Sequence, residues 1–171
     1  VVHLAIDLLK RDVKSVLDAE LTSGSEASRI IVGTVGESDV LKGYAEEVSK
    51  LDGRHEAFLL KVLEDGKLLI AGSDKWGTAY GVLELSRQAG VSPWIWWGDL
   101  VPEKKNHLTI DSGFTTLQGA SVEYRGIFLN DEDWSTRPWS YLNNDPAKPG
   151  YIGKNTYKNI FQLLMRLRAN A

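Results

Sequence analysis

An acidic run, Asn130 to Asp133, directly follows an apolar stretch, residues 122–129, that predicts a β-strand. In a parallel barrel, the carboxyl ends of the strands carry the active site. Carboxylates placed there can act as acid or base, or can accept hydrogen bonds from sugar hydroxyls. Asn130, Asp131 and Glu132 are therefore candidate substrate-binding residues, with Glu132 the first choice. The alternatives are a solvated loop, a capping cluster or a calcium site built from oxygen ligands.

Aromatic and basic side chains surround this run. Trp134, Trp139 and Tyr141 lie in the stretch that follows, and such rings either stack on sugars or simply pack. Trp134 is a further substrate-binding candidate. Arg125, inside the predicted strand, is another, since a guanidinium can bind a substrate carboxylate with two hydrogen bonds. Pairing of Arg125 with a neighbouring acid is the structural alternative.

A second group of indoles, Trp94, Trp96 and Trp97, is dense enough to form a sugar-binding platform. A packing seam between two parts of the protein is the interpretation that we favour, because indole rings bury a large area.

Several other chemistries are not supported. The run Gly33 to Gly36 lies between a predicted strand and helix, but it matches no phosphate-binding motif and indicates a tight turn. This weakens a third hypothesis, a nucleotide-binding domain. His3, His55 and His107 are scattered, and the chain has no cysteine, so we expect no metal and no cofactor. No nucleophile elbow of the G-x-S-x-G type occurs.

The charge and the hydropathy of the chain limit the classes of partner that it is expected to bind. The 171 residues include 20 Lys and Arg against 23 Asp and Glu, a net charge of −3. Nucleic-acid binding requires a basic face, so it is not expected. No stretch approaches the roughly 20 apolar residues that span a bilayer, and the first residues do not have the pattern of a signal peptide. The only methionine is Met165.

The pattern of elements predicts an α/β fold, with a small layered accessory domain over residues 1–116 that has a mixed sheet covered by helices. The expected helices are residues 5–20, 38–50 and 74–90, and the expected strands are 29–33, 55–63, 68–71 and 108–110. Asp65-Gly66 predicts a hairpin between two of these strands. Gly77 and Gly81, four apart on the last helix, predict a close approach to the sheet.

Residues 117–171 read as a linker, one strand, a long loop over 134–153 and an amphipathic helix from about 157 to 170. A TIM-type (β/α)8 barrel repeats such a unit about eight times over about 250 residues. We therefore expect the truncated first βα unit of a barrel. Its apolar faces must pack on the first domain, associate with another copy or remain mobile.

Four ordered blocks resemble glycoside hydrolase family 115, the xylan α-glucuronidases. Residues 71–81 and 90–99 resemble its N-terminal accessory domain, although Gly77 stands where a basic residue is expected in relatives. The same two blocks also resemble family 67 α-glucuronidases and, less closely, hexosaminidases. Residues 122–133 resemble the first strand of the catalytic barrel of family 115, and residues 157–170 resemble the first barrel helix.

The resemblance implies an inverting enzyme that removes glucuronic or 4-O-methylglucuronic acid from xylan, located in the periplasm or secreted. It places the main catalytic acid and base on later strands, so no catalytic residue is expected in this chain and no activity of the chain alone. It also implies a xylan-derived glucurono-oligosaccharide as ligand. Self-association through the exposed barrel unit and a stand-alone carbohydrate-binding module remain the other hypotheses.

Overall fold

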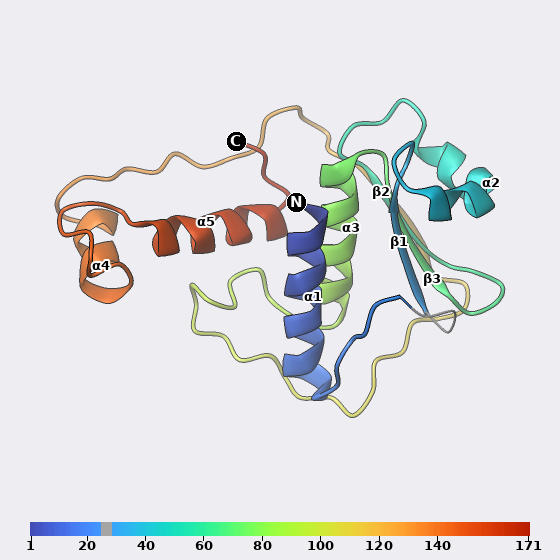
Figure 1. Cartoon of the computed structure of the whole chain (residues 1–171), viewed down its shortest axis with the longest axis horizontal. Helices are drawn as coiled ribbons and strands as arrows, with labels where there is room; N and C mark the ends of the chain where they lie inside the picture. Colours follow the sequence, from blue (N-terminus) through green and yellow to red (C-terminus); the bar gives the residue numbers. More distant parts are fainter. Residues whose placement is uncertain (25–28) are drawn as a thin grey trace.

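A mixed sheet forms the centre of the first part of the molecule (Figure 1). The computed structural model describes residues 1–24 and 29–171. Within them the sheet has the strand order β1-β3-β2-β4. The strands are β1 (Ile30–Thr34), β2 (Phe58–Val62), β3 (Leu68–Gly72) and β4 (Thr115–Gln118). β1 is parallel to β3, whereas β2 is antiparallel to both β3 and β4. The predicted α/β class with a mixed sheet is confirmed.

Two helices lie side by side on one face of this sheet, α1 (Val2–Leu17) and α3 (Lys75–Gln88) (Figure 1). Their inward side chains and one face of β2 and β3 form the main core. Apolar residues of α1 recur every three or four positions, as a helix with one buried face requires. Fully buried members of this core include Ala5, Leu60, Ile70, Ala79 and Val82.

The helix expected over residues 38–50 is broken into three short pieces on the opposite face. They are η1 (Asp39–Tyr44), α2 (Ala45–Val48) and η2 (Ser49–Leu51). Ser38 does not cap the helix, because its Oγ accepts a hydrogen bond from the Thr34 N–H at 2.9 Å instead. Gly43 inside the first piece disfavours a continuous α-helix. Gly33 and Thr34 are the last residues of β1, and the expected turn follows over residues 35–37.

Helix α3 sits very close to the sheet. The Asp74 carboxylate caps it, accepting from the backbone N–H groups of Trp76 and Gly77. A Cβ on Gly77 would overlap the carbonyl of Ala57, and one on Gly81 would crowd two side chains of the sheet, so both glycines are required for packing. This confirms the close approach predicted from their spacing.

The prediction of a strand at residues 108–110 is wrong. That segment is irregular, although Ile110 and Phe114 pack on the main core. The edge strand is β4 instead, in which Thr116 pairs with Leu60 of β2. An edge strand with one solvated side needs few apolar residues, which explains why the polar sequence of β4 was not recognised.

The strand expected at residues 122–129 is also not formed. The segment is extended, and Phe128 is 91% exposed. A strand requires a neighbour for its backbone groups, and among the described residues only Asn170 and Ala171 donate backbone hydrogen bonds to it, both to the Arg125 carbonyl. The expected loop contains a helix, α4 (Thr136–Asn143), whose Pro138 lies in the first turn, where proline is tolerated.

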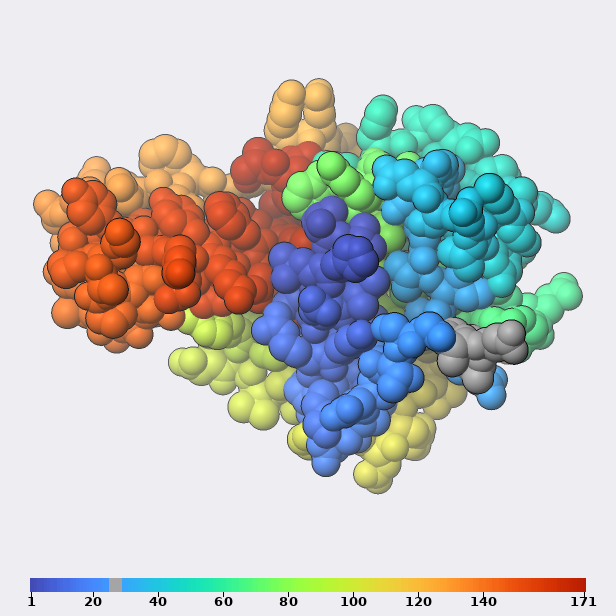
Figure 2. Space-filling model, viewed as in Figure 1, coloured from blue at the N-terminus to red at the C-terminus, as the bar shows by residue number. Residues whose placement is uncertain are grey.

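The last helix, α5 (Lys154–Arg166), carries α4 away from the sheet, and together they form an arm on one side of the molecule (Figures 1 and 2). Its inner end docks on the first part. Ile160, Leu163 and Met165 are buried, and Met165 belongs to the main core. Part of the expected apolar face is open instead, since Leu167 is exposed.

Candidate functional site

The acidic run forms an exposed loop between the extended segment 122–129 and α4. The Trp134 indole N–H donates to Glu132 Oε2 at 2.7 Å, and the Glu132 backbone N–H donates to Asn130 Oδ1 at 3.2 Å. The hydrogen bonds from Trp134 and then Asn130 lower the pKa of Glu132. Glu132 is therefore a carboxylate at neutral pH, which suits a base or an acceptor of sugar hydroxyls rather than an acid.

An arginine that the sequence analysis did not single out organises the rest of this loop. Arg137, on α4, forms an ion pair with Asp133 one turn before it and lies 3.8 Å from Asp131 Oδ1. The guanidinium thus holds both aspartates over the start of α4. A signal was available, because the separation of four between Asp133 and Arg137 is typical of helical ion pairs.

Trp134 is 82% exposed, and its indole N–H is used by Glu132. The exposure leaves the ring face free for stacking on an apolar sugar face. Together, Asn130, Glu132 and Trp134 form a small acceptor-and-platform arrangement. It is open to solvent on a surface rather than enclosed in a cavity.

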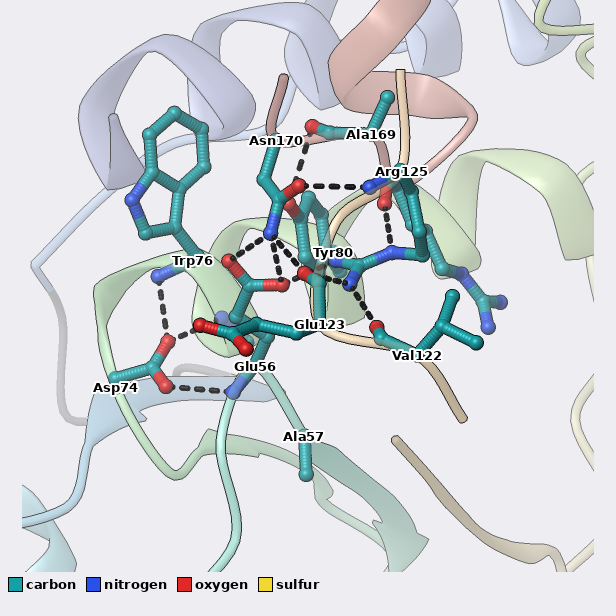
Figure 3. Close-up of polar contacts among 12 residues, drawn as sticks. Glu56, Ala57, Asp74, Trp76, Tyr80, Val122, Glu123, Arg125, Ala169 and Asn170 are labelled. Carbon is teal, nitrogen blue, oxygen red and sulfur yellow. Dashed lines mark hydrogen bonds and ion pairs between the residues drawn. The ribbon is translucent and has the colours of Figure 1, made fainter. Parts of the chain in front are cut away.

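Arg125 lies apart from this loop, beside the N-terminus of α3 (Figure 3). Its Nε donates to the Arg168 carbonyl at 2.8 Å, and its Nη1 donates to the carbonyls of Val122 and Glu123 at 2.8 and 3.0 Å. Its Nη2 pairs with the Glu56 carboxylate. The guanidinium is thus largely occupied by contacts within the chain, as the structural alternative anticipated.

The sequence-predicted candidates therefore fall into two places. Asn130, Asp131, Glu132 and Trp134 share one loop, whereas Arg125 joins a separate cluster. Within residues 1–24 and 29–171, no hydrogen bond or ion pair connects Arg125 with that loop.

Two indoles of the second group form the expected packing seam. The rings of Trp96 and Trp97 meet at right angles, with centroids 4.7 Å apart, and Trp139 of α4 lies 5.8 and 5.6 Å from them. The Trp97 Nε1 donates to the Asn159 carbonyl of α5 at 3.4 Å. The seam therefore joins the segment after α3 to the α4–α5 arm. Trp94 is half exposed and takes no part in these ring pairs.

A buried polar network that no motif signalled ties α4 to α5. The Asp145 carboxylate accepts hydrogen bonds from the backbone N–H groups of Asn155 and Thr156, at 3.0 and 2.9 Å, and from the Thr156 hydroxyl at 2.8 Å. It thus caps the first turn of α5, whose own cap residue, Gly153, has no side chain to do so. Burial raises the pKa of Asp145, but the hydrogen bonds from Thr156 and Asn155 outweigh burial and lower it.

Two ion pairs fasten the end of α5 to the first part of the protein. Arg166 donates two hydrogen bonds, at 2.8 and 2.9 Å, to the Asp12 carboxylate, and the two side chains are 7% and 4% exposed. Arg168 donates to Glu84 at 2.7 Å and to Gln118 at 2.6 Å. Residues so distant along the chain have no spacing that a sequence pattern could reveal.

In the described part of the chain, no group of three or more His, Cys, Asp and Glu residues is arranged to hold a metal ion. None of its helices is both long and apolar enough to span a membrane.

Comparison with known proteins links both parts of the molecule to one family. Residues 118–171 match the model of glycosyl hydrolase family 115. Among solved structures, the chain is similar to BtGH115A, described as a family GH115 4-O-methyl-α-glucuronidase with specificity for decorated arabinogalactans. The two are 50% identical with a TM-score of 0.94, over 99% of this chain and 22% of that chain. No curated protein matches.

The family model covers the acidic loop, α4 and α5, while the structural match also includes the sheet and its helices. The first region, which contains the sheet and its helices, and the second region, residues 122–171, thus have the same arrangement as in the matched part of an enzyme with 50% sequence identity. Together these matches make the chain similar, over both regions, to part of a glycosyl hydrolase family 115 enzyme.

Proposed function

We propose that this chain is the front part of a glycoside hydrolase that removes glucuronic or 4-O-methylglucuronic acid from a polysaccharide, and that the chain alone does not hydrolyse its substrate. The observation that carries the proposal is the 50% identity with BtGH115A over 99% of the chain. The chain spans 22% of that enzyme, so the rest of the site would come from outside the matched part. Within the proposal, residues 1–116 are the accessory domain and residues 117–171 the linker and first barrel unit.

The acidic loop contributes to substrate binding in this proposal. Glu132 is held as an acceptor, and Trp134 offers an open ring face. Inversion of configuration would use an acid and a base about 6.5–9.5 Å apart. The resemblance places both groups on later strands outside this chain, in agreement with the absence of activity that we propose.

The uronic acid is the part of the substrate that the proposal fixes. The resemblance pointed to xylan, whereas BtGH115A has specificity for decorated arabinogalactans. Removal of 4-O-methylglucuronic acid is common to the resemblance and to the description of BtGH115A, so we propose a uronide-bearing oligosaccharide as ligand. The periplasmic or secreted location is part of the same proposal and rests on the resemblance alone.

A graft tests the function directly. The chain would replace the matched 22% of BtGH115A, and release of 4-O-methylglucuronic acid would be measured with decorated xylan and arabinogalactan oligosaccharides. We expect activity in the graft and none in the chain alone. Glu132→Gln in the graft should lower kcat at least about tenfold, a loss of about 1.4 kcal/mol of transition-state stabilisation. Glu123→Gln, which changes another exposed glutamate, is the matched control. Hydrolysis by the isolated chain, or an inactive but folded graft, would contradict the proposal.

A stand-alone carbohydrate-binding module is not favoured. Trp96, Trp97 and Trp139 pack on one another and are only partly exposed, and Trp134, beside the acidic loop, is the most exposed indole of the four. Saturable binding of glucuronoxylan by the isolated chain, followed by tryptophan fluorescence, would revive that function.

We also propose that the exposed apolar side chains of residues 122–171 allow two copies of the chain to associate. Phe128, Tyr124 and Leu142 are each at least 70% exposed. Size-exclusion measurements of mass, with and without residues 122–171, test this. Equal monomeric masses would exclude it.

A further inference from the structure

Glu56 occupies the point where three segments of the chain meet (Figure 3). Its carboxylate pairs with Arg125 of the extended segment and accepts the Asn170 side-chain N–H at 3.0 and 3.1 Å. The Glu56 and Arg125 side chains are 17% and 20% exposed, so solvent screens this pair only partly. One side chain of the first region thus binds two segments of the second region at once.

The backbone of Glu56 is itself held in an unusual conformation. Its φ is 49°, in the left-handed region that non-glycine residues rarely adopt. Its N–H donates to Asp74 Oδ2 at 2.6 Å, and the other Asp74 oxygen accepts from Trp76 and Gly77 at the start of α3. Such strain persists only where the surroundings over-determine it, and here the capped end of α3 does so.

The two segments that Glu56 binds are also joined to each other. The backbone N–H groups of Asn170 and Ala171 donate to the Arg125 carbonyl at 2.8 and 3.0 Å, and the Arg125 N–H donates to Asn170 Oδ1 at 3.0 Å. A Cβ on Gly126 would overlap the Ala171 carbonyl, so the segments are in close contact. The Tyr80 hydroxyl of α3 donates to the Ala169 carbonyl at 3.2 Å.

We propose that Glu56 is a positioning residue that fixes how the segment 122–129 and the segment after α5 align with each other. Because the segment 122–129 leads into the acidic loop, this alignment lets the first region set the position from which the loop starts. The link from this alignment to sugar binding rests on the proposed function, whereas the alignment itself does not.

Amide hydrogen exchange on the chain tests the alignment. Asn170 and Ala171 report the contact, and the central strand β3 reports global stability. In Glu56→Ala we expect at least about tenfold faster exchange at both reporters with β3 unchanged, and in Glu56→Gln a smaller change, since the amide oxygen still accepts a hydrogen bond. The matched control Glu123→Gln should exchange as the unmodified chain does. Unchanged exchange at the reporters in both Glu56 variants, or equal acceleration in β3 with Glu56→Gln, would overturn the proposal.

The BtGH115A graft separates the two levels of the argument. Glu56→Gln should lower kcat several-fold with little change in KM, because Glu56 itself does not contact the substrate in this scheme. If the unmodified graft is inactive, the proposed function fails, while the exchange result still decides the alignment. If the graft is active and Glu56→Gln leaves kcat unchanged, Glu56 has no positioning role.

Discussion

The two regions of this chain are held together by different forces. In residues 2–91 the sheet and helices enclose two clusters of apolar side chains, one on each face. In residues 122–171, apolar side chains such as Phe128 and Phe161 face solvent. The contacts to the first region combine ion pairs with the buried Met165, which belongs to the main core. The first region thus supplies most of the main core, whereas the second is held by Met165 and by ion pairs to Asp12, Glu56 and Glu84.

This difference separates the source of the fold's stability from the source of the second region's orientation. Apolar burial is non-directional and scales with area, so it stabilises without defining one orientation. Charged hydrogen bonds are short and directional, so they define orientation at the cost of desolvation. The second region is consequently placed by directional contacts that single substitutions can remove.

The largest effect should come from the core of the first region. Leu60, a residue of β2, is fully buried in the main core. Leu60→Ala should lower the free energy of unfolding by about 2–5 kcal/mol, because it removes apolar burial and leaves a cavity. Urea denaturation followed by circular dichroism measures this, and Val40→Ala, at an exposed position, is the control. A cost below about 1 kcal/mol would show that the first region is not held by its core.

A smaller and more local effect is expected at the ion pair between α1 and α5. Asp12→Asn should weaken docking of α5 by about 1.5–3 kcal/mol, the usual contribution of hydrogen bonds to a charged group, because it removes the charge that pairs with Arg166. The loss is limited, since the Arg166 guanidinium can be hydrated once α5 moves away from α1. Amide exchange should rise in α5 and stay unchanged in β3. Acceleration in both would mean that the two regions unfold as one unit and would break the comparison.

Thr156→Val should cost about 1 kcal/mol of α5 stability, since it removes one neutral hydroxyl from the network around Asp145. The valine has nearly the same shape, so packing changes little. The exchange rates of amides in the first two turns of α5 measure the effect. Thr109→Val, outside this network, serves as the control, and equal exchange in both variants would contradict a stabilising role of the Thr156 hydroxyl.

The smallest effect should be the loss of α5 stability at low pH. The pKa of Asp145 is below its ordinary value of 3.8, and that of Glu84 is below 4.5, since hydrogen bonds offset burial in both. Their contribution to stability is therefore present above these ordinary values and is lost as pH falls through the lower folded values. α5 should loosen before β3 in exchange measured between about pH 5 and pH 2. Simultaneous loosening would show that the regions do not differ in this respect.

Local patterns predicted most of the first region. The apolar period of α1 and the hairpin at Asp65-Gly66 each depend on neighbours in the sequence, and both are present. β4 was missed because its position depends on pairing with β2 rather than on its own polar residues.

The candidate site was predictable only where it is local. Asn130, Glu132 and Trp134 are contiguous in sequence, and the structure places them in one loop. Glu56 and Asn170 were not found, because their meeting depends on the tertiary fold and no short motif records it. The apolar run at 122–129 predicted a strand that is not formed here, since strand formation also depends on a neighbouring chain.

The perpendicular indoles of Trp96 and Trp97 have an optical consequence. Two such rings in contact couple their electronic transitions and give a paired positive and negative band in far-ultraviolet circular dichroism. Because Trp139 of the arm packs against both rings, lifting the arm would alter that signal. The protein thus carries an intrinsic, label-free reporter of whether its two regions are engaged.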